Sequence, residues 1–210
     1  MEREDALQLL QLIHGSDLVA LAAKHGRKIF HEKELAGEIK RTMNKGWAGL
    51  TLEAYLGLKP NSSREPNGGS WELKQVSLKR NRQHGLTAKE TMQITMLDRE
   101  HTIANTFETS HVLHKVERSI IVAREYMDRD ETSSPIAYVG AADISWHIEP
   151  IYRQVEKDYE MIRRILALGG PLHTISGELI QIRTKGQKNS HTYAFYAKTN
   201  FVNILLGLNK

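Results

Sequence analysis

The sequence has no cysteine among its 210 residues, so it can form neither a disulfide bond nor a thiolate metal site. It has no apolar run near the ~18 residues of a membrane span. Its N-terminus, MEREDALQLL, is charged and lacks the apolar stretch of a signal peptide. These absences predict a cytoplasmic protein without a membrane segment. Any metal must be bound by carboxylates, carbonyls or imidazoles, and the first two favour hard cations such as Mg²⁺.

The composition is that of an ordinary globular protein, with 40% hydrophobic and 26% charged residues. A chain of this length predicts a single domain over residues 1–210, either compact or divided into two lobes. The formal net charge is +4 and the pI is about 9.2. This balance fits a polyanionic partner, and it fits equally well a basic surface with no special role.

The distribution of apolar residues predicts an α/β fold in which helices flank a mixed central sheet. Proline, asparagine, serine and glycine mark residues 59–69 as a loop. The predicted helices cover residues 4–14, 17–25, 33–43, 47–57, about 150–167, and 200 onward. The predicted strands cover residues 70–78, 90–97, 118–124, 136–142 and 178–183.

The segment that follows this loop, SWELKQV, contains the pattern most suggestive of chemistry. Side chains alternate along a strand, so Glu72 and Lys74 are expected on one face, with Trp71 and Leu73 on the other. A carboxylate there can hold a divalent cation, and an ammonium can orient a water or stabilise charge on a phosphate. The alternative is an ion pair on a solvated strand, which is the commoner origin of so short a pattern.

Three other charged residues are candidates for the same site. Glu65 lies seven residues before Glu72 in the preceding loop. Glu53 lies on a predicted helix among small and apolar residues, where a carboxylate needs a neutralising partner. Lys115 precedes a predicted buried strand. Alternatively, Glu53 lies at the rim of an amphipathic helix and Lys115 on the surface.

The basic segment of residues 183–198, RTKGQKNSHTYAFYAK, is a candidate for binding a nucleic acid. Its lysines and arginine suit phosphates, and Arg183 could bond a guanine edge. Tyr196 could lie against a base and sense an adenine methyl group. The alternative is a solvated basic loop before a strand whose aromatic residues face the core.

Several short runs together resemble the MutH family of DNA endonucleases. They occur in the family's order and comprise NKGWAG and LE at residues 44–53, WELK at 71–74, FETSHVLHK at 107–115, ELIQIR at 178–183 and FYAKTNF at 195–201.

The resemblance implies the restriction-endonuclease-like PD-(D/E)xK fold. It assigns Glu72 and Lys74 to the acid and the lysine of that signature, Glu53 to the helix carboxylate and Lys115 to an additional active-site lysine. Glu65 stands where the family has an aspartate, and Asn67 is another candidate in that loop.

The same resemblance implies that Glu65, Glu72 and the Leu73 carbonyl bind Mg²⁺. It places Lys45, Arg183 and Tyr196 at DNA-contacting positions, and we add Lys185 and Lys198 from the basic segment. Thr184 stands where the family has a proline.

The residue pattern and the resemblance together predict a Mg²⁺-dependent, site-specific endonuclease that acts on double-stranded DNA, and the resemblance implies that it leaves 5′-phosphate ends. We favour a type II restriction enzyme, of which many act as homodimers. The alternatives are a mismatch-repair nicking enzyme for hemimethylated GATC sites that responds to a repair partner, and a DNA-binding module without catalytic activity.

Overall fold

The computed structural model describes residues 1–35, 38–59, 66–82, 85–145, 149–172, 175–186 and 191–208. In chain order the elements are α1 (Arg3–Gln11), α2 (Leu18–Lys24), β1 (Phe30–Leu35), β2 (Glu38–Met43), α3 (Trp47–Tyr55), β3 (Glu72–Asn81), β4 (Gly85–Ala88), β5 (Met92–Met96), α4 (Arg99–Ala104), η1 (Phe107–Thr109), α5 (His111–Val116), β6 (Ser119–Glu125), β7 (Ile136–Ala142), α6 (Glu149–Ala167), β8 (Ile180–Thr184), β9 (Tyr193–Ala197) and α7 (Thr199–Leu205).

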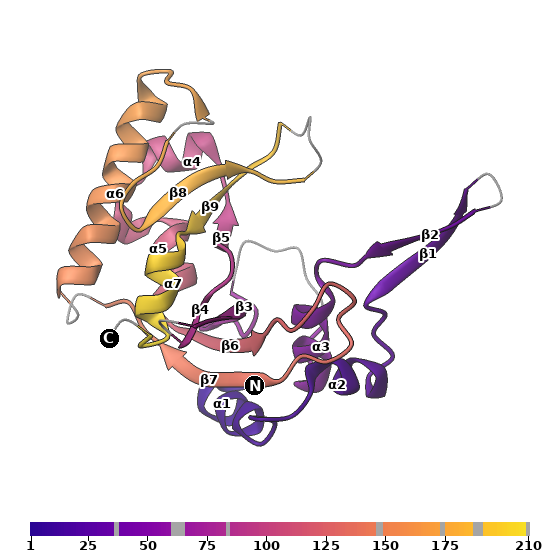
Figure 1. The fold of residues 1–210 in the computed structure, drawn as a ribbon. Helices are drawn as coiled ribbons and strands as arrows, with labels where there is room; N and C mark the ends of the chain where they lie inside the picture. The colour runs from indigo at the N-terminus through magenta and orange to yellow at the C-terminus, as the bar shows by residue number, and fades with distance from the viewer. Residues whose placement is uncertain are drawn as a thin grey trace.

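A four-stranded mixed sheet, in the order β4-β3-β6-β7, forms the base of the fold (Figure 1). Strands β3 and β6 run parallel with Glu72 opposite Ser119, while the outer pairs are antiparallel. This confirms the predicted α/β class with a mixed central sheet. A second, antiparallel sheet has the order β5-β9-β8, and β1 pairs with β2 as a separate hairpin.

Two hydrophobic cores lie on opposite faces of the mixed sheet. Trp71 and Leu73 belong to the core formed with α1, α2 and α3, whereas Val76 and Leu78 belong to the core formed with α5, α6 and the second sheet. Strand β6 contributes to both cores with an uninterrupted buried run, as expected of a strand covered on both faces. The alternation along β3 therefore directs Glu72 and Lys74 toward the second sheet.

The helix predicted over residues 33–43 is wrong, because β1 and β2 occupy this region as an antiparallel hairpin. Leu35, Ile39 and Met43 recur at the spacing of a helix, but Ile39 is 71% exposed in the structure. The middle of the stripe therefore meets no core surface, and a helix there would gain little packing energy. Cross-strand contacts favour the ribbon instead: Glu32 lies opposite Arg41, whose guanidinium lies 3.7 Å from the ring centroid of Phe30. The hairpin projects from the body (Figure 1).

The predicted long helix is confirmed as α6, which buries Val155, Tyr159, Ile162 and Leu166 in the core. Among the described residues, no helix has the length and apolar character needed to cross a bilayer.

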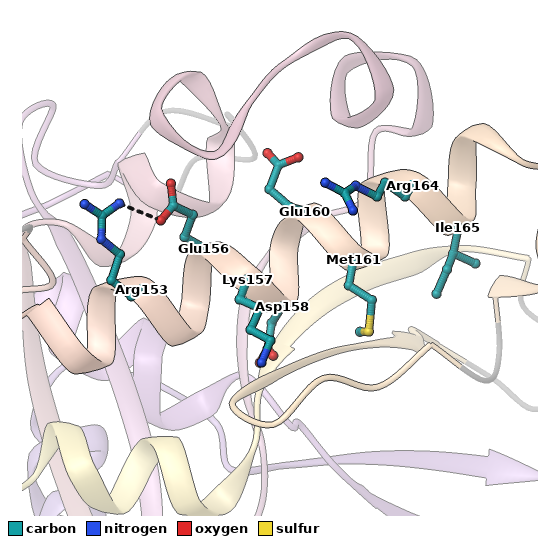
Figure 2. Close-up of a pocket in the computed structure, with 8 residues that line it drawn as sticks. All are labelled: Arg153, Glu156, Lys157, Asp158, Glu160, Met161, Arg164 and Ile165. Carbon is teal, nitrogen blue, oxygen red and sulfur yellow. Dashed lines mark hydrogen bonds and ion pairs between the residues drawn. The ribbon is translucent and has the colours of Figure 1, made fainter.

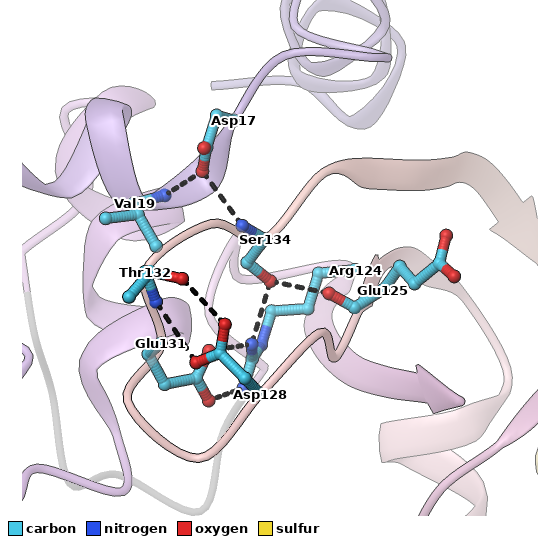
Figure 3. Close-up of polar contacts among 8 residues, drawn as sticks. All are labelled: Asp17, Val19, Arg124, Glu125, Asp128, Glu131, Thr132 and Ser134. Atoms are coloured by element: carbon cyan, nitrogen blue, oxygen red, sulfur yellow. Dashed lines mark hydrogen bonds and ion pairs between the residues drawn. The ribbon is translucent and has the colours of Figure 1, made fainter. Parts of the chain in front are cut away.

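A buried ion pair connects the β6–β7 region to α3. Arg124 on β6 binds both carboxylate oxygens of Glu131, at 2.6 and 2.8 Å, and also donates to Ser134 (Figure 3). The guanidinium lies 4.9 Å from the ring of Trp47, the first residue of α3. This network anchors the start of the helix that carries Glu53.

Candidate active site

The carboxylate of Glu72 lies between two lysine ammonium groups. Lys74 donates to Oε1 at 2.7 Å, and Lys115 on α5 donates to Oε2 at 2.9 Å. Glu72 is 4% exposed, and the side chains of Lys74 and Lys115 are 14% and 8% exposed. Glu72 and Lys74 thus share one face of β3, as the alternation predicts. Burial excludes the alternatives of an ion pair on a solvated strand and of a surface Lys115.

A second carboxylate reaches the same place from α3. The Asn67 backbone N–H donates to Glu72 Oε2 and its side-chain amide donates to Glu53 Oε1, both at 3.0 Å. Asn67 thus holds the two acidic groups next to each other. Lys74 also donates to the Ile94 carbonyl at 3.0 Å, which fixes the ammonium between β3 and β5.

Burial and neighbouring charges shift the pKa values of Glu53 and Lys74 in this cluster. Burial raises the pKa of Glu53, and the charge of Glu72 raises it further, while Arg27 and the Asn67 hydrogen bond act in the opposite direction. Burial also lowers the pKa of Lys74, which Glu72 opposes and the charges of Lys115 and Lys185 reinforce. A divalent cation between Glu53 and Glu72 would relieve the repulsion between the carboxylates. Their oxygen atoms are the ligands that Mg²⁺ prefers.

The predicted metal ligands are only partly described. Glu65 lies outside the described residues. Leu73 follows Glu72 in β3, and its side chain is buried in the opposite core. Within the described ranges no three histidine, aspartate or glutamate side chains gather to hold a metal. Glu53 and Glu72 are therefore the acidic ligands that the described part of the site offers, and they fit Mg²⁺.

Strands β8 and β9 bring two of the predicted DNA-binding residues together. The Arg183 guanidinium lies 5.7 Å from the ring centroid of Tyr196 and donates to Thr91 Oγ1 at 2.9 Å. Tyr196 is half-buried, and burial raises its pKa. Phe195 faces the core, as expected if the aromatic residues of this strand serve packing. Tyr196 projects from the opposite face of the same strand.

The three predicted DNA-binding lysines lie in different places. Lys45 is exposed in the turn before α3. Lys185 is exposed beyond the end of β8, and its ammonium contacts Met96 Sδ at 3.4 Å. Lys198 lies at the opposite end of the β8–β9 ladder and donates to the Gly177 carbonyl at 2.9 Å. The structure therefore does not bring Lys198 together with Arg183 and Lys185.

Sequence reasoning missed the contributions of Arg27, Thr91 and the Ile94 carbonyl. Arg27 follows α2 and is remote in sequence from Glu53, whose charge it balances. Thr91 directly precedes β5 and Ile94 lies within it. The contacts of both residues depend on how the second sheet packs over β3. No local sequence signal marks these contacts.

The mixed central sheet flanked by helices, with a buried acid and lysine two residues apart on β3, is a restriction-endonuclease-like fold of the PD-(D/E)xK class. Residues 56–163 match the family described as DNA mismatch repair enzyme MutH.

Relatives named DNA mismatch repair protein MutH extend this match. The Haemophilus ducreyi protein is 32% identical over 70% of this chain and 64% of its own length. The Escherichia coli protein is 30% identical over 78% of this chain and 77% of its own, and the Enterobacter protein is 27% identical over 97% and 90%. The chain belongs to the MutH family. Its match to the Haemophilus ducreyi relative spans just under two thirds of that protein.

Proposed function

We propose that this chain is a MutH-type DNA mismatch-repair endonuclease that nicks one strand of duplex DNA, with hemimethylated GATC as the expected site. The observation that carries the proposal is the buried Glu72 carboxylate held between Lys74 and Lys115 and beside Glu53. A structural ion pair needs one lysine and no second acid. Two lysines bound to one carboxylate, with a second carboxylate joined to it through Asn67, provide both cation ligands and positive charge for a phosphate.

Glu53 and Glu72 would hold Mg²⁺, together with Glu65 and the Leu73 carbonyl. A bound Mg²⁺ supplies Lewis-acid stabilisation of the negative charge that develops on the attacked phosphate. Lys74 would orient the attacking water, since its ammonium is fixed by Glu72 and the Ile94 carbonyl. Lys115 would stabilise negative charge on the same phosphate.

Duplex DNA would be bound by Arg183 and Tyr196 at base edges, and by Lys45 and Lys185 at phosphates. Arg183 and Tyr196 already lie against one another, so this pair needs little reorganisation to meet a base. A homodimer is not required for nicking one strand. A mismatch-repair partner would then control when the enzyme cuts.

The test is a plasmid nicking assay with Mg²⁺ and defined methylation. Lys74→Ala should lower the nicking rate by about 10³-fold, because it removes a group that acts on the reacting water. DNA binding supported by Ca²⁺ should remain. Lys79→Ala changes an exposed lysine on the same strand and should nick like the wild type. Nicking by Lys74→Ala at the wild-type rate would contradict the assignment.

The same assay separates the rival functions. A restriction enzyme would rapidly convert unmethylated plasmid to linear DNA without a partner, and a DNA-binding module would bind without cutting. The relatives are named as mismatch-repair proteins, which favours the nicking enzyme over the restriction enzyme. The intact arrangement of Glu53, Glu72, Lys74 and Lys115 favours an enzyme over a binding module.

A further inference from the structure

A buried carboxylate outside the candidate active site holds the start of β8. Asp158, in the middle of α6, is 3% exposed. Its oxygens accept the backbone N–H groups of Glu178, Leu179 and Ile180, at 3.0, 2.6 and 3.0 Å. The Gln154 side-chain amide donates to it at 2.9 Å. In the described part of the chain, no lysine or arginine forms an ion pair with this aspartate.

The turn that Asp158 binds must have a glycine at the position next to the carboxylate. A Cβ on Gly177 would lie 2.3 Å from Asp158 Cγ, so only glycine fits there. The turn is also bound from α7 and its N-cap: Lys198 donates to the Gly177 carbonyl and Asn200 to the Glu178 carbonyl. Asp158 is among the α6 residues that line a hollow of about 560 Å³. Figure 2 shows these side chains along the helix, and none of them belongs to the candidate active site.

Strand β8 needs such an anchor because it is the edge strand of its sheet. In the order β5-β9-β8, the ladder to β9 holds β8 from one side. On its other side, among the described residues, only the short segment 175–177 pairs with it, through the Ile182 N–H to the Ile175 carbonyl and the Gly177 N–H to the Ile180 carbonyl. That segment leads into the turn bound by Asp158, so it would move together with β8. The side-chain period of a strand is two, so an edge strand can slip by two residues and keep its apolar face buried. Such a slip would move Arg183 by about 7 Å at about 3.3 Å per residue. Three N–H groups bound to one carboxylate fix both the position and the register of the strand.

We propose that Asp158 is a positioning residue for DNA recognition: by anchoring residues 178–180 it sets where Arg183 lies relative to Glu72 and Lys74. The inference rests on the proposed function. Arg183 is three residues beyond the last anchored N–H group on the same short strand, so the position of the anchor is transmitted directly along the backbone. Asp158 itself lies on α6 and would contact no DNA.

The test compares Asp158→Asn with the wild type on a hemimethylated GATC duplex and on a duplex with one base pair of that site changed. An asparagine offers one acceptor oxygen, and its amide group opposes the N–H donors. We expect about tenfold weaker Ca²⁺-supported binding to the GATC duplex and a smaller preference over the changed duplex, with kcat at saturating DNA within about twofold of wild type.

A matched control is available on the same helix. Glu160 accepts hydrogen bonds from the Phe107 N–H and from Arg163, and makes no contact with β8 in the described structure. Glu160→Gln therefore removes the charge of a half-buried carboxylate on α6 without affecting the hydrogen bonds of Asp158 to residues 178–180. It should retain wild-type sequence preference even if it lowers stability.

A double-variant cycle separates positioning from general loss of structure. If Asp158 acts through Arg183, the Asp158→Asn change should weaken binding no further in an Arg183→Ala background. Independent, additive losses would overturn the proposal, as would a wild-type preference in Asp158→Asn. Where Asp158→Asn does not fold, Asn200→Ala decides, since it removes a hydrogen bond to the same turn: about threefold weaker specific binding supports the proposal, and unchanged binding overturns it.

The wild-type protein alone tests the proposed function. If the wild type neither binds nor nicks GATC duplexes, the proposed function fails. If the wild type does so and the Asp158 variants match it, the positioning role fails while the proposed function stands.

Discussion

Glu72 and Asp158 are both buried carboxylates, 4% and 3% exposed, but they are neutralised in different ways. Glu72 receives two lysine ammonium groups and the Asn67 N–H, whereas Asp158 receives three backbone N–H groups and a side-chain amide. Backbone donors are fixed once the strand has folded. Lysine side chains can rotate or lose a proton, so the partners of Glu72 can change when a cation or phosphate arrives. Glu72 is thus suited to a catalytic role, and Asp158 to holding the backbone in one position.

The Arg124–Glu131 pair belongs with Asp158 in this comparison. The two terminal guanidinium nitrogens of Arg124 bind the carboxylate, and Ser134 connects the pair to the Glu125 carbonyl (Figure 3). Arginine retains its charge and its planar geometry favours two parallel bonds. A bidentate arginine in contact with Trp47 therefore stabilises α3 but offers no group that can give up a proton.

The largest effect is expected at Glu72. Glu72→Gln should lower nicking by about 10³-fold or more, because it removes a proposed cation ligand and the partner of Lys74. The free energy of unfolding should fall by less than about 2 kcal/mol, since burial already lowers the pKa of Lys74 and the unpaired ammonium can lose its proton. Plasmid nicking and urea denaturation measure the two quantities. A large loss of stability with nicking retained would show that Glu72 is a structural residue, like Asp158, and not part of the catalytic site.

The opposite pattern is expected at Glu131. Glu131→Gln should lower the free energy of unfolding by about 3 kcal/mol, because it leaves the buried guanidinium of Arg124 without its counter-charge. Arginine cannot relieve this by deprotonation. At a temperature where the variant remains folded, kcat for nicking should stay within about twofold of wild type. A Glu131→Gln protein as stable as the wild type would show that the pair is not structural.

Much of the fold could be predicted because local patterns and tertiary contacts agree. The apolar stripe of α6, the buried run of β6 and the alternation around Glu72 each specify one structure. The helix predicted over residues 33–43 is wrong because Ile39, in the middle of the apolar spacing of Leu35, Ile39 and Met43, finds no core to pack against, and the region pairs as a hairpin instead. Weak local signals also left β4, α4 and α5 unpredicted, although Lys115 on α5 was a candidate from its place before a buried strand and from the resemblance.

The partners within the site were less predictable than its principal residues. Glu72 and Lys74 are adjacent on one strand, so their proximity follows from strand geometry. Asp158 occupies a buried position on α6, but its partners at 178–180 are backbone groups that carry no side-chain signature. The role of such a carboxylate depends on which turn packs against it, and that is determined by tertiary structure.

The smallest effect is expected at Asp17, a half-buried counterpart of Asp158. Asp17 caps α2 by accepting the Val19 N–H at 2.8 Å, and it accepts the Ser134 N–H at 3.0 Å (Figure 3). Burial alone would raise the pKa of Asp17, but hydrogen bonds from Ser133, Ser134, Val19 and Ala20 outweigh it and lower the pKa. A lowered pKa contributes stability above the ordinary value of 3.8, and that contribution is lost as the pH falls through the folded-state pKa.

Asp17→Asn keeps a capping oxygen but removes the charge, so it should lower the free energy of unfolding by about 0.5 kcal/mol at pH 7. The stabilities of Asp17→Asn and wild type should converge below pH 3.8, as measured by urea denaturation across a pH series. Asp17→Ala also removes the oxygen, and its deficit of about 1 kcal/mol should persist in acid. If the Asn variant remains less stable than wild type at low pH, hydrogen-bond geometry rather than charge determines how surface aspartates hold backbone N–H groups, and the same explanation would then extend to Asp158.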